Sequence, residues 1–284
     1  MTSILENQDW IVLPQLSNRQ EWISALKAAA TKAGRVLLDV DQDQSASAPP
    51  HALLLTASAD NARKHQPDAN RIAAILDTPN IDTPDGVEQS ERHRIVHVAT
   101  HGFAQITLLP KDRIFEAGSA GGLSIHPFPD LEVLRPPLPS AAQGPLATAL
   151  QIYTQDKAIW SGEVLSWLKP PVHVAGSTSL DLTGRPRTIV HGPYFEMPAG
   201  RWKATFTLSV DHYSARYLFR IDWGGLESYS SQEFRPQRPG IYEIDMVYEW
   251  MSQGACEFRL LVMEGVFHGD ISVSDIKVSR IENA

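Results

Sequence analysis

The sequence of 284 residues predicts an α+β protein of two domains, a small N-terminal α/β domain followed by a C-terminal antiparallel β-sandwich of the jelly-roll type. Three observations lead to this prediction. Residues 187–281 read as strands separated by short turns, residues 8–117 alternate short apolar strands with helical segments, and residues 118–150 are rich in Gly, Pro, Ser and Ala. We therefore expect an α/β domain at 8–117, a connector at 118–150 and a sandwich at 151–284, since a chain of this length accommodates two domains.

The N-terminal domain is expected to open with a short apolar strand at 9–14. A helix should follow, because Ser17 or Asn18 can cap its first turn and Gly34 can end it. The apolar residues between these signals recur at helical spacing; they are Trp22, Ile23, Leu26 and Ala29.

Two further apolar runs, at 35–40 and 51–56, lack alternation, as expected for strands covered on both faces. Residues 58–65 predict a short helix, whereas 71–77 is compatible with a fourth strand or a continued helix, because periodicity does not decide so short a run. Strands that alternate with helices favour a small parallel or mixed sheet. The sequence has no strand leading into a Gly-x-Gly-x-x-Gly turn and no P-loop pattern, so it carries neither nucleotide-binding signature.

The connector at 118–150 cannot form a long helix, because prolines recur along it: Pro127, Pro129, Pro136, Pro137, Pro139 and Pro145. Its segment 118–122, Gly-Ser-Ala-Gly-Gly, could cradle a phosphate through backbone N–H groups, but it lacks a following Lys and Ser or Thr. We interpret the whole region as an extended connector. Beyond it, 147–154 and 157–167 read as strands that begin the sandwich or form a bridging layer.

Strict alternation defines the core face of the predicted sandwich. In residues 201–210 every second side chain is apolar: Trp202, Ala204, Phe206, Leu208 and Val210. Three later segments show the same division, namely 217–223, 242–248 and 256–262. In the last strand the apolar residues change phase after Val273, which predicts a β-bulge near Ser274 and Asp275. Several strands at this spacing favour a sandwich or jelly roll.

The segment 191–206, HGPYFEMPAGRWKATF, resembles the opening of a bacterial module that is itself similar to carbohydrate-binding jelly rolls. Modules of this kind are found attached to bacterial glycosyltransferases and other polysaccharide-synthesis proteins. The resemblance extends through the closing strand at 271–281 and depends on structural residues, since Gly192 and Pro193 shape the strand entry and 198–200 form a turn. It implies a saccharide or glycan as ligand and a glycosyltransferase or another biosynthesis protein as partner. It carries over no catalytic residues.

One end of the sandwich is the first candidate ligand site. Antiparallel strands reverse direction at each turn, so the loops at 211–215, 236–240 and 265–270 should gather at the same end. They bring together aromatic and polar side chains: His212, Tyr213, Phe267, His268 and Asp270. Sugar recognition needs a flat apolar ring against the C–H face of a pyranose and planar polar groups around its edge. We therefore predict a shallow glycan site at this end.

The opposite end is a second candidate, near Trp223 and Trp250, although both rings continue the core-facing alternation and can instead close the sandwich. A series of charged residues lies on the other face of the strands: Arg220, Asp222, Glu243, Asp245, Glu249, Glu257 and Arg259. They could hydrogen-bond a polysaccharide, but ion pairing across a solvated sheet explains them without a ligand.

Neither a metal site nor a nucleophile is indicated. His93, His97 and His101 are four residues apart and share one face whether the segment is a helix or a strand, but the zinc motif His-Glu-x-x-His is absent and Arg92 and Arg94 would repel a cation. No Gly-x-Ser-x-Gly elbow occurs, and the single cysteine, Cys256, alternates with core residues. We expect no metal and no cofactor, and the role of the three histidines is left open.

Net charge and the length of the apolar runs argue against two kinds of partner, nucleic acid and a membrane. A formal charge of −8 disfavours nucleic acid, because such partners select for clustered Lys and Arg. No apolar run approaches the roughly 20 residues that span a bilayer, and residues 1–8 lack the features of a signal peptide, so we expect no membrane insertion and a cytoplasmic location.

The function that follows is a non-catalytic, carbohydrate-associated protein of bacterial glycan biosynthesis, which binds a saccharide through the C-terminal sandwich. Two alternatives stay open. One is a sugar-modifying or glycosyltransferase-associated enzyme that uses the α/β domain, and the other is a protein-interaction module, because a sandwich does not fix a function.

Overall fold

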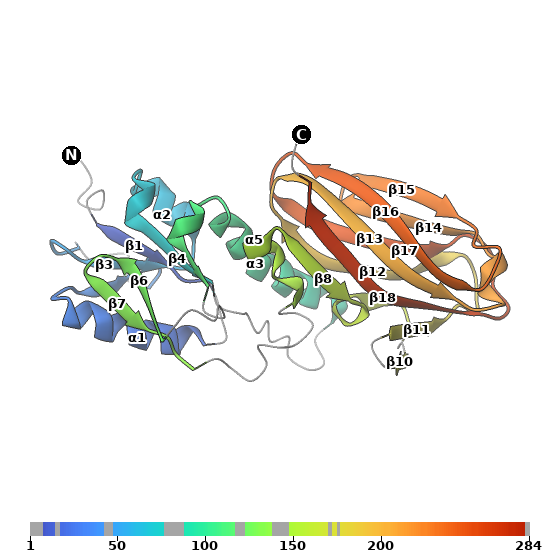
Figure 1. Cartoon of the computed structure of the whole chain (residues 1–284), viewed down its shortest axis with the longest axis horizontal. Helices are drawn as coiled ribbons and strands as arrows, with labels where there is room; N and C mark the ends of the chain where they lie inside the picture. The colour runs from blue at the N-terminus through green and yellow to red at the C-terminus, as the bar shows by residue number, and fades with distance from the viewer. Residues whose placement is uncertain are drawn as a thin grey trace. The chain divides into compact units, whose positions relative to one another are not determined.

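A computed structural model describes residues 8–14, 18–42, 48–76, 88–116, 123–137, 148–169, 172–174 and 177–281. The chain divides into an α/β unit, formed by Met1–Pro84 and Val98–Gln143, and a sandwich unit, formed by Asp85–His97 and Gly144–Ala284 (Figure 1). The predicted fold class, an α/β domain and an antiparallel β-sandwich, is confirmed.

Within its described residues, the α/β unit contains a parallel sheet of five strands in the order β2-β3-β1-β4-β5. The strands are β1 (Asp9–Val12), β2 (Leu37–Asp39), β3 (Leu53–Thr56), β4 (Ile72–Leu76) and β5 (Ile114–Glu116). Between them lie α1 (Arg19–Lys32), α2 (Ala59–His65) and α3 (Gln89–Ile106), with 3-10 turns at Ala69–Arg71 and Lys111–Arg113. All side chains of β3 and β4 are buried, as expected for a sheet covered on both faces. Within the ambiguous segment at 71–77, Ile72–Leu76 forms strand β4.

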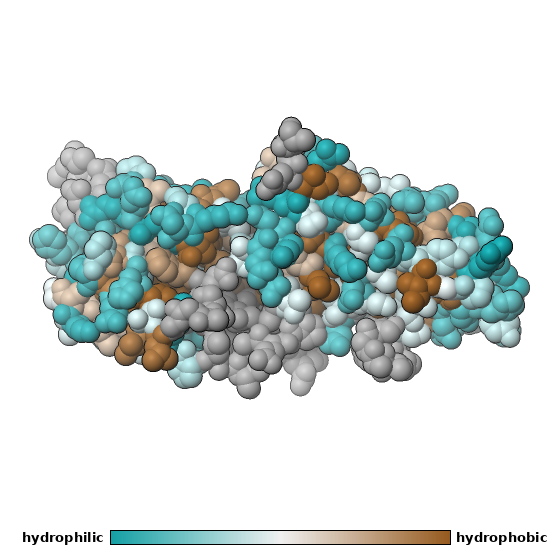
Figure 2. Space-filling view, viewed as in Figure 1, coloured by the Kyte–Doolittle hydropathy of each residue, from teal (hydrophilic) through white to brown (hydrophobic). Residues whose placement is uncertain are grey.

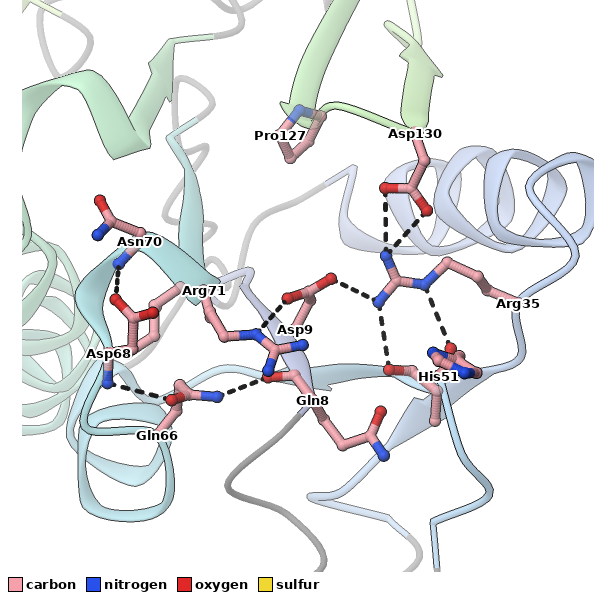
Figure 3. A network of polar contacts seen from close by, with 12 residues as sticks. Gln8, Asp9, Arg35, His51, Gln66, Asp68, Asn70, Arg71, Pro127 and Asp130 are labelled. Atoms are coloured by element: carbon pink, nitrogen blue, oxygen red, sulfur yellow. Dashed lines mark hydrogen bonds and ion pairs between the residues drawn. The ribbon is translucent and has the colours of Figure 1, made fainter.

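An ionic network closes the amino-terminal edge of this sheet (Figure 3). The Asp9 carboxylate lies 2.8 Å from an Arg35 nitrogen and 2.9 Å from Arg71 Nε. Arg35 also donates to the backbone oxygens of His51 and Ala52. Because these residues begin or precede neighbouring strands, the network joins the amino ends of β1 to β4.

A hairpin of β6 (Ser124–Phe128) and β7 (Leu131–Leu134) also belongs to the α/β unit. Arg35 reaches its turn at Asp130, 3.4 Å away, and the guanidinium groups of Arg35 and Arg113 lie 5.8 and 5.1 Å from the centre of the Phe128 ring. The sequence predicted an extended connector over this region, whereas the structure pairs the two strands. Their register shifts between Ile125 and Phe128, where Pro127 has no N–H to donate.

The expectation of a strand over 147–154 is wrong, because Ile152–Gln155 forms a short helix, α5. Ile152 and Tyr153 are buried, and the Tyr153 hydroxyl donates to the backbone oxygen of Glu196 at 2.7 Å. Both side chains thus reach the core from a single helical turn. The segment predicted as one strand at 157–167 comprises β8 (Lys157–Ser161), a 3-10 turn (Gly162–Val164) and β9 (Ser166–Trp167).

In its described part, the sandwich unit has two antiparallel sheets (Figure 1). The first has the order β10-β11-β18-β13-β16, with β8 also paired to β18, and the second has the order β15-β14-β17-β12-β9. The strands are β10 (Val172–Val174), β11 (Ser177–Asp181), β12 (Arg187–Met197), β13 (Gly200–Val210), β14 (Phe219–Gly225), β15 (Tyr229–Phe234), β16 (Gly240–Trp250), β17 (Gly254–Val262) and β18 (Asp270–Arg280). The 3-10 turn Ser214–Arg216 lies between β13 and β14.

The core of the sandwich lies between these sheets and follows the predicted alternation. Trp202, Phe206 and Phe258 are completely buried, and the Phe206 and Phe258 rings stack with centroids 4.7 Å apart, which joins the two sheets. The predicted bulge is also present, because β18 places Ser274 and Asp275 opposite a single residue of β13.

The surface is polar and mixed. On the face drawn in Figure 2, hydrophobic residues form small separate groups among hydrophilic ones, which is normal for a globular surface. None of the helices in the described ranges combines the length and apolar character needed to cross a bilayer.

Candidate functional site

The loops at one end of the sandwich meet as the strand order predicts. Gln237 donates its backbone N–H to the carbonyl of Ala215 at 2.7 Å, which joins the loop before β16 to the loop after β13. The backbone N–H of Phe267 points to the Tyr217 hydroxyl at 3.4 Å, which brings in the loop before β18. We call this group of loops the loop end.

Aromatic side chains are displayed at the loop end. Tyr213 is 53% exposed and Phe267 is 78% exposed, and they are the two aromatic residues among the exposed large hydrophobic side chains of the described chain. The Tyr213 ring lies 5.7 Å from the His212 ring and 6.1 Å from the His268 ring, between centroids. The structure therefore brings together three of the five predicted residues by ring contact.

The remaining two predicted residues flank these rings. Phe267 precedes His268 in the same loop, and Asp270 begins β18, where it pairs with Asp181 of β11. Burial raises the pKa of the Asp270 carboxyl above its usual range, and the neighbouring carboxylates of Asp211 and Asp181 raise it further. Asp181 has the opposite shift, because the hydroxyl and backbone N–H of Thr183 donate to it and lower its pKa.

The opposite end of the sandwich is closed by its tryptophans. Trp223 is completely buried, Trp250 is 5% exposed, and their ring centroids lie 5.1 Å apart. Tyr248 packs against Trp250 with centroids 4.6 Å apart and covers the backbone of Gly224, where a Cβ atom would lie 2.7 Å from the Tyr248 ring. Neither tryptophan ring presents a face to solution, so both act as core residues.

The outer face of the second sheet holds a polar cluster that includes Glu257 and Arg259, two residues of the charged series predicted either to form ion pairs on a solvated face or to hydrogen-bond a polysaccharide. Glu257 is 3% exposed, and its carboxylate accepts hydrogen bonds of 2.6 Å from the Tyr194 and Tyr229 hydroxyls. Arg259 lies 2.5 Å from the same carboxylate and 4.5 Å above the Tyr229 ring. We call Tyr194, Tyr229, Glu257 and Arg259 the tyrosine clamp.

Electrostatics in the tyrosine clamp favour the ionised carboxylate. Burial opposes the charge, but hydrogen bonds from Arg259, Tyr194 and Tyr229 outweigh it and lower the pKa of Glu257. Burial, followed by the hydrogen bond to Glu257, raises the pKa of both tyrosines, so they stay protonated and act as donors. The clamp therefore surrounds one ionised carboxylate with two hydroxyl donors and a guanidinium, and it joins β12, β15 and β17.

The sequence predicts only that Tyr194 packs; its hydrogen bond to Glu257 could not be predicted, because a register shift between Pro193 and Glu196 interrupts the alternation of β12. Tyr194 has φ +65°, and its hydroxyl lies 2.8 Å from His191 Nδ1. The only signal in the sequence was the Gly192-Pro193 pair, which indicates an irregular strand.

Two of the three regularly spaced histidines contact the sandwich. The His93 ring lies 4.1 Å from the Tyr194 ring, and its Nε2 lies 2.8 Å from Ser166 Oγ. His97 Nδ1 lies 3.1 Å from the buried Glu196 carboxylate. His101 is exposed in the part of α3 that belongs to the α/β unit. Across the described residues, no group of three His, Cys, Asp or Glu side chains is placed to hold a metal ion.

Two other candidates of the sequence offer no described site. Cys256 is completely buried, and burial raises the pKa of its thiol, which disfavours the reactive thiolate. The Gly-rich segment 118–122 lies outside the described residues.

No protein-family model matches the sequence, and no curated protein matches it. Among solved structures, the sandwich is similar to TmCBM61, a carbohydrate-binding module in complex with β-1,4-galactotriose, at 12% identity over 45% of this chain and 90% of that chain, with a TM-score of 0.31. The xylan-binding module CBM15 matches at 10% identity over 45% of this chain and 99% of that chain, with a TM-score of 0.31.

A third similar structure is the C-terminal CBM6 module of LamC from Zobellia galactanivorans, at 12% identity over 44% of this chain and 99% of that chain, with a TM-score of 0.30. The C-terminal β-sandwich is thus structurally similar to carbohydrate-binding modules, while the low identity carries over no ligand residues.

Proposed function

We propose that this protein binds a saccharide at the loop end of its β-sandwich. One observation carries the proposal: Tyr213 and Phe267, the exposed aromatic rings of the described chain, lie in loops at the same end. Exposed aromatic rings cost free energy in water, and the C–H face of a pyranose is a ligand that can cover them.

The polar groups around these rings suit the rest of a sugar. His212, His268 and Asp270 supply ring nitrogens and a carboxylate that can hydrogen-bond the hydroxyl groups at the edge of a pyranose. A few polar groups around an apolar surface orient a ligand, whereas the rings provide most of the contact area. The loop end contains both kinds of group.

The orientation of the rings favours a short stretch of a soluble glycan as the ligand. Tyr213 makes interplanar angles of 75° with His212 and 60° with His268, so both histidine rings are steeply inclined to the Tyr213 ring. A flat insoluble polysaccharide surface would need coplanar rings for simultaneous stacking. Inclined rings instead suit contact with one or two sugar units from different sides.

The biological setting that we propose is bacterial glycan biosynthesis, with a glycosyltransferase or another biosynthesis protein as partner. Its support is the resemblance of residues 191–206 to a module attached to such proteins. Co-purification of the intact chain with a glycosyltransferase from a glycan-producing bacterium would test this part separately from saccharide binding.

Screening the intact chain on a glycan array, followed by calorimetry on each hit, tests the ligand site. The probes should include β-1,4-galactotriose and xylan oligosaccharides. We expect Tyr213→Ala and Phe267→Ala each to weaken binding by roughly fivefold to tenfold, because an aromatic contact is worth about 1 kcal/mol beyond its buried area.

The matched control is Met251→Ala, which removes a side chain that is 87% exposed in the loop between β16 and β17, away from the loop end. Its affinity should equal that of the wild type. Unchanged affinity in both ring variants would place the ligand elsewhere, and the absence of any glycan ligand would contradict the proposal as a whole.

A further inference from the structure

The Asp211 carboxylate accepts hydrogen bonds from the backbone of the loop that carries Tyr213. Asp211 Oδ1 accepts the backbone N–H groups of Tyr213 at 3.1 Å and Ser214 at 2.7 Å, and it lies 2.5 Å from Ser214 Oγ. Such local bonds from an aspartate to the following backbone define a tight turn. The position of the Tyr213 backbone therefore depends on Asp211.

The same serine links this turn to the loop that carries Phe267 and His268. Ser214 is completely buried, and its Oγ also lies 2.7 Å from the carbonyl oxygen of Asp270, so Asp211 Oδ1 and this carbonyl share the single proton of the hydroxyl. The backbone N–H of Asp211 also points to this carbonyl, at 3.4 Å. The two loops touch at Gly269, which has φ +139° and where a Cβ atom would lie 2.9 Å from Ser214 N.

We propose that Asp211 and Ser214 are positioning residues of the loop end, which hold the Tyr213 loop and the Phe267 loop in one fixed arrangement before a ligand binds. This inference rests on the proposed saccharide site. Ser214 is buried, so it acts through the backbone of both loops and not by contact with a ligand. Fixing ring-bearing loops in advance lowers the conformational entropy that binding must otherwise remove.

The link between the two loops, made by the contacts of Asp211 and Ser214, depends on pH through the charge of Asp211. Burial opposes ionisation of Asp211, but hydrogen bonds from the Ser214 side chain and from the Ser214, Asp270 and Tyr213 backbones outweigh it and lower the pKa of this carboxyl. The Asp270 carboxylate interacts with Asp211 and with Asp181, and the titratable rings of His212 and His268 lie beside Tyr213. Because the folded pKa is depressed, the link is complete above the ordinary Asp pKa of about 3.9 and is lost only as pH falls through the lower folded value.

Hydrogen–deuterium exchange of the intact chain tests the link without a ligand. The readout is the exchange rate of peptides that cover 211–217 and 264–270. We expect Ser214→Ala to speed exchange in both peptides by roughly tenfold, as expected for the loss of one buried hydrogen bond. Asp211→Ala should do the same, and Asp211→Asn should restore part of the protection because its amide oxygen still accepts the backbone N–H groups.

The matched control is Thr205→Ala, which removes a hydroxyl that donates to Asp245 at 2.6 Å on the outer face of the first sheet. It should leave both loop peptides unchanged. Faster exchange in the 211–217 peptide alone, or in neither peptide, would overturn the link between the loops.

Calorimetry on a glycan found by the array adds the functional readout. Ser214→Ala should weaken binding by roughly threefold to tenfold while Tyr213 and Phe267 are intact, because the loops must then be ordered during binding. Wild-type affinity in a variant with fast exchange in both loops would show that the link does not position the site. If the wild type binds no glycan, the proposed function fails, and the exchange experiment still decides whether the link exists.

Discussion

Tyr194 has a left-handed backbone conformation, which is unfavourable for a residue with a side chain. Its φ of +65° costs roughly 1 kcal/mol or more for a residue that is not glycine. The same conformation brings its hydroxyl to 2.6 Å from the Glu257 carboxylate, in the middle of the outer face of the second sheet. Hydrogen bonds to a buried charge are strong, so this contact offsets the backbone cost.

Glu257 carries the negative charge at the centre of the tyrosine clamp. Glu257→Gln keeps the shape of the side chain, but it replaces an acceptor oxygen with a donor NH₂ group that faces Tyr194, Tyr229 or Arg259. We expect the free energy of unfolding, measured by urea denaturation, to fall by about 2 kcal/mol. Glu243→Gln is the matched control, because Glu243 is exposed and its 3.6 Å contact with Lys277 is on the surface. Equal stability of the two variants would show that the tyrosine clamp contributes little.

The hairpin β6–β7 shows how a single side chain can attach an element. Arg35 is 7% exposed in its side chain and contacts Asp9, Asp130, two backbone oxygens and the Phe128 ring. These contacts join the hairpin to the amino-terminal edge of the parallel sheet (Figure 3). Removing the guanidinium would leave Asp9 with Arg71 as its remaining described ion-pair partner.

We expect Arg35→Leu to lower the free energy of unfolding of the α/β unit by about 3 kcal/mol, because breaking a buried ion pair leaves a charge poorly compensated. Urea denaturation followed by far-UV circular dichroism measures this change. Lys32→Leu is the control, since Lys32 also pairs with the hairpin, at Glu132, but on the surface at 3.3 Å. Its stability should stay close to that of the wild type, and a similar loss in both variants would contradict the role given to Arg35.

Elements with a clear local pattern could be predicted from the sequence, whether the pattern is strict alternation, as in the sandwich, or a short apolar run or helical spacing, as in β1, β3 and α1 of the α/β unit. A period of two places Trp202 and Phe206 on one face of β13 wherever that strand lies, so the sandwich core and the bulge at Ser274 followed from local pattern. The helix at 152–155 and the hairpin at 124–134 depend on what buries Ile152 and what pairs across Pro127, which no short window of sequence contains.

In the candidate site, too, some residues could be predicted from the sequence and others could not. Strand reversal placed Tyr213 and His268 at one end because it depends only on strand order. The support from Ser214 depends on a contact with the carbonyl of Asp270, 56 residues away, and the alternation of strands says nothing about such contacts. Whether the loop end binds a glycan remains a prediction.

The sandwich unit combines the first half of α3 with two sheets. The first half of α3 places the His93 ring 4.1 Å from the Tyr194 ring and 5.4 Å from the His191 ring. Burial lowers the pKa of His191; Glu257 partly opposes this shift, and Arg259 adds to it. Protonation of His191 is therefore disfavoured in the folded state.

The stability of the molecule should consequently depend on pH through His191. Because the folded pKa is below the ordinary histidine value of about 6.5, its contribution is complete above that value and is lost as pH falls toward the folded pKa. We expect the wild-type Tm to drop between about pH 7.5 and about pH 5.5, and His191→Asn to reduce that drop. His126→Asn, at an exposed position of β6, should keep the wild-type dependence. Identical pH profiles of wild type and His191→Asn would exclude this group as the cause.

The path of α3 has a consequence for how this protein can be divided. The helix belongs to the sandwich unit as far as His97 and to the α/β unit from Val98 onward, and the chain re-enters the sandwich at Gly144. Neither unit is one uninterrupted stretch of sequence. A fragment that began at Gly144 would keep the described strands of the sandwich, β8 to β18. It would lose the first half of α3, which places the His93 ring against the Tyr194 ring. Truncation at a single point therefore cannot isolate the whole sandwich unit.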